Sequence, residues 1–275
     1  MRGYSMTTKI GIDAGGTLVK VAYLDNNNIE FRTFRSQQLD EVIKWITTNF
    51  ERVEVCLTGG KSEILAQKLQ GPTQTIVEFE ATSKGVDYLA NEQNLHFSNG
   101  FILANVGTGT SIHHMKDGKQ ERVIGSGVGG GTLLGLSYLV SGETEYEKII
   151  NLSLQGNRGN IDLKVEDIFE GAVPPISGDL TASNFGKLSK MMAEKPSKTD
   201  ALASVIGLIG ETVVTICIQV ADTYQTSDIL YIGSTLRSNS ILAGIMNNYT
   251  KLRGKQPFFL ENGEFSGAIG ALLSI

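Results

Sequence analysis

The stretch KIGIDAGGTLVKVAY, residues 9–23, constrains the fold more than any other segment of the chain. Apolar residues alternate with other residues on both sides of residues 14–17, so the pattern predicts two strands joined by a tight hairpin turn. Glycines let the backbone approach a ligand closely, and successive N–H groups of such a turn can converge on an anion. Asp13 at the strand end can hold a metal ion, directly or through water. The stretch therefore predicts a hairpin tip suited to a magnesium polyphosphate.

A nucleotide P-loop and an ordinary glycine hairpin are the alternatives for this stretch. A P-loop has the spacing G-x-x-x-x-G-K-[ST] and leads from a strand into a helix. Residues 13–20 lack that spacing and connect two expected strands, so the P-loop class is excluded. An ordinary hairpin with a solvated Asp13 stays open, because short glycine motifs occur often by chance.

Composition favours a globular chain with one large or two moderate domains, since 41% of its 275 residues are hydrophobic and 19% are charged. No uninterrupted apolar run reaches the roughly 18 residues of a membrane span. The first residues lack the basic-then-apolar order of a signal peptide, so a cytoplasmic protein without a membrane partner is expected. Residues 1–8 carry little pattern and are expected to be a disordered leader, with Met6 as a candidate natural start.

Cysteine usage and net charge limit the classes of metal and macromolecular partner that this chain can have. Cys56 and Cys217 lie far apart in apolar runs, which indicates buried free thiols in a reducing compartment and not a zinc site. The net charge is −5 and the basic residues are dispersed, so no general attraction to nucleic acid is expected. The expected partner is a small molecule.

Strand and helix patterns alternate along the chain. Helical periodicity is expected over residues 39–50, 63–69, 163–169, 199–224 and 239–249 and near the carboxyl end, with strands over 53–60, 75–81, 101–107, 228–233 and 257–262. Asp117-Gly118 predicts a second hairpin turn. Residues 157–200 hold most of the prolines and are expected to join two larger units. Glycine hairpins in both halves predict two related α/β lobes facing a cleft, with residues 9–100 in one lobe and 101–275 in the other.

Four further small-residue segments follow apolar strands, at residues 57–60, 105–111, 125–132 and 231–235. Backbone amides and hydroxyls at such strand ends could surround a phosphate chain or an adenosine. The segment GSGVGG at 125–130 also satisfies G-x-G-x-x-G, so a dinucleotide-binding oxidoreductase is kept as the second hypothesis. Its position in the middle of the chain and the absence of a βαβ pattern with a following acid count against that hypothesis.

Glu78 and Glu80 alternate with apolar residues in TIVEFEA, so both carboxylates are expected on one face of a strand. Two like charges in a partly enclosed site raise the pKa of one carboxyl group, which suits a general base. The spacing does not show which glutamate would be that base. A solvated strand face stays open as the alternative. Arg122 could bind a substrate carboxylate or form a surface ion pair. His96, His113 and His114 show no ligand spacing and receive no role.

The order GIDAGGTLVK, NVGTGTS, RVIGSGVGGGTLLG, DILYIGST resembles the acetate and sugar kinase, heat-shock protein and actin superfamily. Together with VEFEA, GNIDLKVEDIF, LTASNFG and ENGEFSGAIGAL it is similar to the type II pantothenate kinases, from Lys9 to about Leu272. The resemblance implies a two-lobed, actin-like (ribonuclease H-like) α/β ATPase fold with a nucleotide cleft between the lobes. It also implies a homodimer that uses ATP and Mg²⁺ to phosphorylate pantothenate to 4'-phosphopantothenate, the first step of coenzyme A biosynthesis.

The resemblance assigns roles by position. The resemblance implies that Glu78 is the general base and that Arg122 binds pantothenate. It also implies that Asp13 holds the Mg²⁺ ion through water and that Tyr249 reaches the pantothenate of a neighbouring subunit. ATP-binding positions are Asp13, Ala14, Gly15, Gly16, Thr17, Leu18, Val19, Lys20, Gly107, Thr108, Gly130, Gly131, Thr132, Leu133, Leu134, Tyr146 and Ser234.

Two positions depart from the family pattern. Glu80 stands where relatives often have Asp, and Lys61 stands where some have a third glycine. A sugar kinase of the same superfamily is the nearest alternative; it usually has an aspartate base, and many bacterial forms carry a Cys-rich zinc motif that two distant cysteines cannot supply. A ligand-sensing regulator finds no support, since no helix-turn-helix or basic segment is evident.

Overall fold

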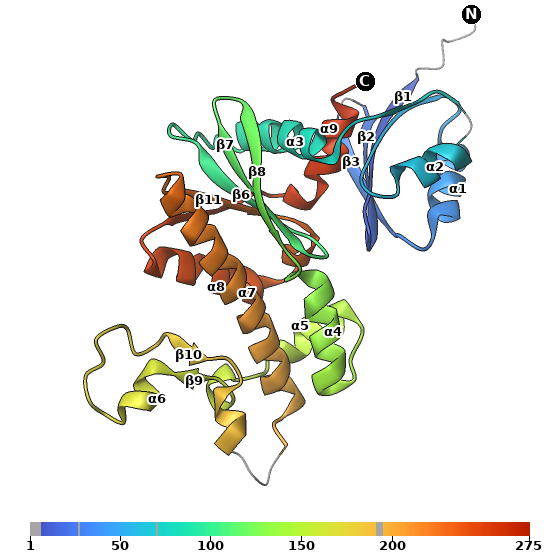
Figure 1. Ribbon diagram of the computed structural model, residues 1–275. Helices are drawn as coiled ribbons and strands as arrows, with labels where there is room; N and C mark the ends of the chain where they lie inside the picture. Colours follow the sequence, from blue (N-terminus) through green and yellow to red (C-terminus); the bar gives the residue numbers. More distant parts are fainter. Residues whose placement is uncertain (1–6, 27, 70, 191–194) are drawn as a thin grey trace, which may run out of the picture.

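The computed structural model describes residues 7–26, 28–69, 71–190 and 195–275, and it contains two five-stranded mixed sheets with helices around them (Figure 1). The first sheet consists of β1 (Thr8–Ala14), β2 (Leu18–Asp25), β3 (Asn28–Arg35), β4 (Val53–Thr58) and β5 (Thr73–Thr75). The second consists of β6 (Phe101–Val106), β7 (Thr110–Lys116), β8 (Lys119–Ser126), β11 (Asp228–Ile232) and β12 (Gln256–Phe259). A small sheet pairs β9 (Leu163–Lys164) with β10 (Thr181–Ser183). Residues 1–6 of the expected leader lie outside the described residues.

Both large sheets have the same topology. The strand order is β3-β2-β1-β4-β5 in one sheet and β8-β7-β6-β11-β12 in the other. In each, the first three strands in sequence pair antiparallel, and the last two run parallel to the first. The predicted pair of α/β lobes is confirmed, and the turn at Asp117 and Gly118 has positive φ at both residues, as a two-residue hairpin requires.

Helices cover the outer faces of both sheets and fill the space between them (Figure 1). The α-helices are α1 (Leu39–Asn49), α2 (Ser62–Lys68), α3 (Glu78–Glu92), α4 (Gly130–Ser141), α5 (Tyr146–Ser153), α6 (Val165–Phe169), α7 (Lys198–Thr223), α8 (Ser240–Leu252) and α9 (Ser266–Leu272). Short 3₁₀ helices are η1 (Arg158–Asn160), η2 (Gly186–Lys190), η3 (Ser234–Leu236) and η4 (Gly263–Phe265). Helices α1 and α2 bury Val42, Ile46 and Leu65 against the first sheet, whereas α4, α5, α7 and α8 share a core with the second.

Helix α7 is a core helix. It has the length and apolar composition of a membrane-crossing helix, but 72% of its most apolar window is buried inside the protein. Cys217 of this helix is fully buried and, like Cys56 of β4, is a free thiol, as the sequence predicts. Burial therefore accounts for the apolar composition of α7, which gives no support for a membrane span.

Helices α3 and α9 form the contact between the two sheets, and glycines let them approach closely. A Cβ atom at Gly85 of α3 would stand 1.9 Å from the carbonyl oxygen of Ser266, and one at Gly270 of α9 would stand 1.7 Å from that of Ala81. Neither distance is possible for real atoms, so both positions require glycine. The core around these helices contains Leu230 from the second sheet and Ala22 from the first.

Three sequence expectations about elements are wrong. The strand expected over 75–81 ends at Thr75, and α3 begins at Glu78 because residues 78–92 place their apolar positions at helical spacing against α9. In the helix expected over 163–169, the first two residues instead form β9. The described part of 157–200 does not join the lobes; it projects beyond α7 at the end of the molecule away from the first sheet (Figure 1).

Candidate active site

The hairpin tips of the two sheets meet at one cavity of about 750 Å³. The β1–β2 turn contributes Gly15, Gly16 and Thr17, and the β6–β7 turn contributes Gly107 and Thr108. The hydroxyl oxygens of Thr17 and Thr108 lie 2.9 Å apart, so the two tips are in hydrogen-bonding contact. The sequence-predicted cleft between the lobes is present, with glycine-rich turns on both sides.

A second cavity, of about 480 Å³, continues from the first along the cleft, since both are lined by Thr17, Thr108 and Ser234. Tyr146 at the start of α5 lies in its wall and donates its hydroxyl hydrogen to the Thr235 carbonyl oxygen at 2.5 Å. Burial raises the Tyr146 pKa to about 12, so this phenol stays a neutral donor. The wall of the second cavity is more apolar than that of the first and suits the adenosine end of a nucleotide.

Asp13 is the acidic group of the β1–β2 tip. It ends β1 opposite Lys20 of β2, and the two side chains form an ion pair with a 2.6 Å nitrogen–oxygen distance. Gly59 and Gly267 flank the carboxylate; Cβ atoms at these positions would come within 2.7 and 3.0 Å of its oxygens. The glycines therefore leave the carboxylate free to face the cavity, which it lines together with Lys20.

Hydrogen bonds brace the β1–β2 tip from behind. The Gly15 N–H donates to the Leu18 carbonyl at 3.1 Å, and the Ser36 hydroxyl donates to the Gly15 carbonyl at 2.7 Å. Lys61 donates its backbone N–H to the Ala14 carbonyl and its ammonium to the Ser36 carbonyl. The departure from a third glycine at Lys61 thus adds support to the tip without blocking it.

The start of α4 is fixed to the β6–β7 tip and offers few free donors. The N–H groups of Gly130 and Gly131 donate to the carbonyls of Gly107 and Thr108, each at 2.8 Å. Because these amides are already paired, their role is to hold the tip in place. The dinucleotide hypothesis for residues 125–130 fails on topology, since β8 pairs antiparallel with β7 and no βαβ unit surrounds the glycines.

Glu78 opens α3 and lines the first cavity. Its pKa is raised, mainly because the surrounding protein desolvates the carboxyl and then because Asp13 places a second negative charge nearby, while Lys20 lowers it. A carboxylate with a raised pKa is a stronger base. Glu78 therefore has the position and chemistry of a general base for a substrate hydroxyl in this cavity.

Glu80 does not share a face with Glu78, which corrects the sequence expectation. Residues two apart on a helix differ by about 200° in direction. Glu80 points to solvent and pairs with Lys84, one turn further along α3, at 3.1 Å. The like charge that raises the pKa of Glu78 belongs to Asp13, not to Glu80.

A β-bulge directs Arg122 into the cavity. Ile112 of β7 pairs with Ile124, but the next residue, His113, pairs with Arg122, so Val123 is an extra residue in β8. An extra residue shifts the alternation by one and reverses the faces of the residues before it. The guanidinium lies over Gly125, where a Cβ would stand 2.5 Å from it. Arg122 has no salt bridge among the described residues, so the surface ion-pair alternative is wrong.

The structure separates the predicted site residues into three groups. Those that line one or both cleft cavities are Asp13, Gly15, Gly16, Thr17, Leu18, Lys20, Glu78, Gly107, Thr108, Arg122, Gly130, Leu134, Tyr146 and Ser234. Those that support the cleft from behind are Ala14, Val19 and Leu133, which are fully buried, together with Gly131 and Thr132. Tyr249 lies apart, in the wall of a cavity of about 440 Å³ formed by α7, α8 and the segment around β10.

Sequence reasoning missed several cavity residues. Phe79, Asn105 and Ser111 line the first cavity, and Arg35 and Arg237 line the second. Asn105 and Ser111 lie within the segment NVGTGTS, so their place at a strand end is the signal that could have selected them. The alternation in TIVEFEA predicts that Phe79 lies on the strand face opposite the two glutamates, but Phe79 lines the cavity because α3 begins one residue earlier.

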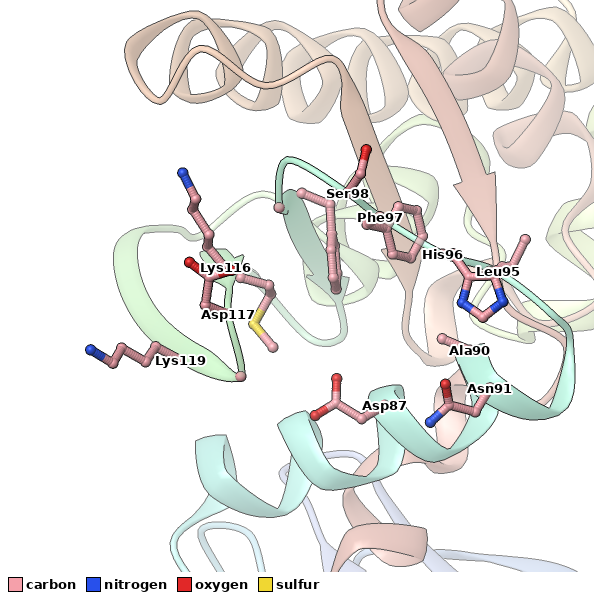
Figure 2. A pocket seen from close by; sticks show the side chains of 14 residues that line it. Asp87, Ala90, Asn91, Leu95, His96, Phe97, Ser98, Lys116, Asp117 and Lys119 are labelled. Atoms are coloured by element: carbon pink, nitrogen blue, oxygen red, sulfur yellow. The ribbon is translucent and has the colours of Figure 1, made fainter.

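A separate cavity of about 570 Å³ lies at the other end of α3 (Figure 2). It opens between Asp87 and Asn91 of α3 and the β7–β8 turn, which contributes Lys116 and Lys119. It shares no lining residue with the cleft cavities. Its wall also lacks the glycine-rich strand ends that characterise the cleft, so it is not part of the candidate active site.

Two mixed sheets of the same topology with a cleft between their hairpin tips define a two-lobed α/β protein with the actin-like fold. Solved structures share this fold at low identity. The activator of the 2-hydroxyisocaproyl-CoA dehydratase from Clostridium difficile with bound ADPNP has a TM-score of 0.64 at 13% identity, covering 98% of this chain and 94% of its own. A ROK family glucokinase from Streptomyces griseus, in complex with glucose and AMPPNP, has a TM-score of 0.60 at 11% identity, covering 97% and 98%.

Residues 25–274 match the Fumble family. Curated type II pantothenate kinases from Staphylococcus aureus, strains USA300 and bovine RF122/ET3-1, are each 44% identical over 265 residues, which is 96% of this chain and 98% of theirs. The chain therefore belongs to the Fumble family, and its resemblance to the type II pantothenate kinases is confirmed.

Proposed function

We propose that this chain transfers the terminal phosphoryl group of ATP to the primary hydroxyl of pantothenate and so forms 4'-phosphopantothenate for coenzyme A biosynthesis. The observation that carries the proposal is the 44% identity to type II pantothenate kinases over nearly the whole chain. The cleft supports it, because one cavity brings together a polyphosphate-type glycine tip, a carboxylate of raised pKa and Arg122, which forms no salt bridge with a described residue.

Each charged group of the cavity has a distinct part in this proposal. Glu78 accepts the proton of the pantothenate hydroxyl as it attacks, and Arg122 binds the pantothenate carboxylate with paired hydrogen bonds. The glycine tips and Lys20 bind the phosphates, and the hydroxyls of Thr17 and Thr108 exchange their mutual hydrogen bond for phosphate oxygens. Phosphoryl transfer depends mainly on positioning and charge stabilisation, which fits a cavity lined by glycine tips and charged side chains.

The residues of the cleft fit a magnesium ion that arrives with ATP. Mg²⁺ is usually held by one or two carboxylates together with substrate phosphates and water. Within the described ranges, no three His, Cys, Asp or Glu side chains lie close enough together to hold a metal ion. A metal ion held by the protein alone therefore has no support there. Asp13 would hold the ion through its water shell, and the ion would neutralise charge on the transferring phosphates.

A homodimer in the cytoplasm completes the proposal. Tyr249 lies on α8, away from the cleft of its own chain, and could serve pantothenate only in a neighbouring subunit. Leu252, which shares the wall of that cavity with Tyr249, is exposed, and so are Ile168 and Val173 in the projecting segment. Exposed apolar side chains of this size support an interface between two copies. The proposed lobes are residues 9–100 and 101–275, with α9 of the second packed on β1 of the first.

The proposal is tested by measuring ADP release with MgATP and one acceptor at a time. Pantothenate should give turnover, and glucose and N-acetylglucosamine should not exceed the rate without an acceptor. Turnover with a sugar in preference to pantothenate would assign the chain to the sugar kinases instead.

The proposed homodimer has its own test. Light scattering on the same sample should give the mass of two chains. A Tyr249→Phe variant should alter the kinetics with pantothenate and leave those with ATP unchanged.

A further inference from the structure

Three polar side chains form a line behind the pantothenate end of the cleft. His113 of β7 is 1% exposed, and its ring lies between Ser111 of the same strand and Gln120 of β8. Its Nε2 atom is 3.1 Å from the Ser111 hydroxyl oxygen, and its Nδ1 atom is 3.1 Å from the Gln120 side-chain nitrogen. Ser111 lines the cleft cavity, whereas His113 does not. The ring is therefore within reach of the substrate only through Ser111.

His113 has one ring proton at working pH. Burial, and after it the positive charge of Arg122, lowers its pKa to about 4. Phe79 covers the ring on the cleft side, with ring centroids 5.0 Å apart. A neutral imidazole donates from one nitrogen and accepts at the other, so the partners of the two nitrogens decide which atom carries the proton.

The direction of these two hydrogen bonds follows from the side chain of Gln120. Its amide nitrogen can only donate, so Nδ1 of His113 must accept and the ring proton lies on Nε2. The Nε2–H group then donates to the oxygen of Ser111. That leaves the Ser111 hydroxyl hydrogen free to point into the cavity.

The β-bulge at Val123 makes this arrangement possible. Because one residue is inserted in β8 between the pairs Ile112–Ile124 and His113–Arg122, both Arg122 and Gln120 lie on the face of β7 that carries Ser111 and His113. Regular pairing would have directed Gln120 to the opposite face. The same bulge thus sets the arginine of the cavity and the donor that orients the histidine.

We propose that His113 is a positioning residue whose Nε2–H tautomer, set by Gln120, makes the Ser111 hydroxyl a hydrogen-bond donor to an acceptor oxygen of the alcohol substrate. The acceptor is a carboxylate or amide carbonyl oxygen, since Ser111 and Arg122 line the same cavity and both present donors to it. The substrate part of this inference rests on the proposed function, whereas the tautomer part does not.

The tautomer is measured directly by long-range ¹H–¹⁵N correlation spectra of the full chain at neutral pH. The chain has three histidines, and a His113→Asn variant identifies the signals of His113. A protonated Nε2 and an unprotonated Nδ1 are expected. The opposite tautomer would mean that Gln120 accepts and Ser111 donates to the ring, and it would overturn the proposal without touching the proposed function.

Kinetics tests the action through Ser111. Gln120→Met keeps the side-chain length but cannot donate, so the KM for pantothenate should rise about two- to tenfold while kcat and the KM for ATP stay within about twofold. Gln74→Met serves as the control, since Gln74 is an exposed strand glutamine outside the cleft. Its kinetics should match those of the unaltered chain.

A double-variant comparison separates positioning from a general packing effect. In a Ser111→Ala background, Gln120→Met should have no further effect on the KM for pantothenate, because its partner at the substrate is gone. If the two substitutions instead raised the KM for pantothenate independently, so that their effects multiplied, the proposed hydrogen-bond path from Gln120 through His113 to Ser111 would be wrong. If the unaltered protein shows no pantothenate turnover, the proposed function fails, while the spectra still decide the tautomer.

Discussion

At the scale of single residues, two carboxylates face one cavity and differ in their partners. Asp13 forms an ion pair with Lys20 at a nitrogen–oxygen distance of 2.6 Å, and its carboxylate oxygens suit a cation's water shell. Glu78 has no such partner among the described salt bridges, and desolvation together with the charge of Asp13 raises its pKa. The two environments separate a carboxylate that has a cationic partner from one whose raised pKa suits it to take up the proton of an alcohol.

Glu78→Gln should lower kcat about 10²- to 10⁴-fold and leave the KM for ATP nearly unchanged, because only proton acceptance is lost. In the unaltered chain, kcat/KM should fall as the pH is lowered through the raised pKa of Glu78. Glu80→Gln is the matched control in the same helical turn, since its partner is Lys84 at the surface. A Glu78→Gln variant with unaltered kcat would exclude the base assignment.

The same substitution should make the fold more stable at neutral pH. A carboxyl whose folded pKa is above its unfolded value favours folding only when protonated, so its contribution is lost as the pH rises through the folded pKa. Glutamine is neutral at every pH. The melting temperature of Glu78→Gln should therefore exceed that of the unaltered chain above this pKa and approach it in acid, whereas Glu80→Gln should show no increase.

At the scale of elements, helix α3 joins the site to the packing between the sheets. Its first turn carries Glu78 into the cavity, and its middle crosses α9 at Gly85 and Gly270, where no side chain fits. Helices that touch through glycine transmit small displacements directly, because close-packed backbones have no side chains that can adjust. The position of the proposed base thus depends on a contact formed by the last helix of the chain.

Gly270→Ala should destabilise the fold by about 1–3 kcal/mol and also lower kcat, because its Cβ would meet the backbone of Ala81 and push α3 away. Gly244→Ala is the matched control in α8, where no atom lies within 4 Å of the added Cβ. It should stabilise the chain, since alanine is favoured over glycine in a helix. Denaturant unfolding and steady-state kinetics measure both effects; equal stability of the two variants would contradict the role of this contact.

At the scale of the whole molecule, local patterns in the sequence predicted the two lobes and the tips that form the cleft. Alternating apolar residues and glycine turns are local signals, and they placed Asp13 at the end of a strand and Thr108 in a small-residue segment after a strand. Two features depend on distant contacts and were not predictable in this way. The segment that opens with Glu78 is helical because it packs against α9, and Arg122 reaches the cavity because Val123 bulges from β8.

The lobes should close further when both substrates are bound. Two side-chain hydrogen bonds between described residues cross the mouth of the cleft: the Thr17–Thr108 hydroxyl pair joins the tips, and Arg237 donates to the Thr33 hydroxyl at 3.1 Å. Such contacts are easily exchanged for contacts with a nucleotide, and closure would exclude water from the phosphoryl group and limit ATP hydrolysis.

Small-angle scattering measures this closure. The protein with both a magnesium-bound, non-hydrolysable ATP analogue and pantothenate should have a smaller radius of gyration than the free protein or the protein with either ligand alone. Forward scattering must show an unchanged mass, so that a change in subunit number is not mistaken for closure. Equal radii in all four states would show that the cleft works without closing, and the Glu78 carboxylate would then have to act in contact with bulk water.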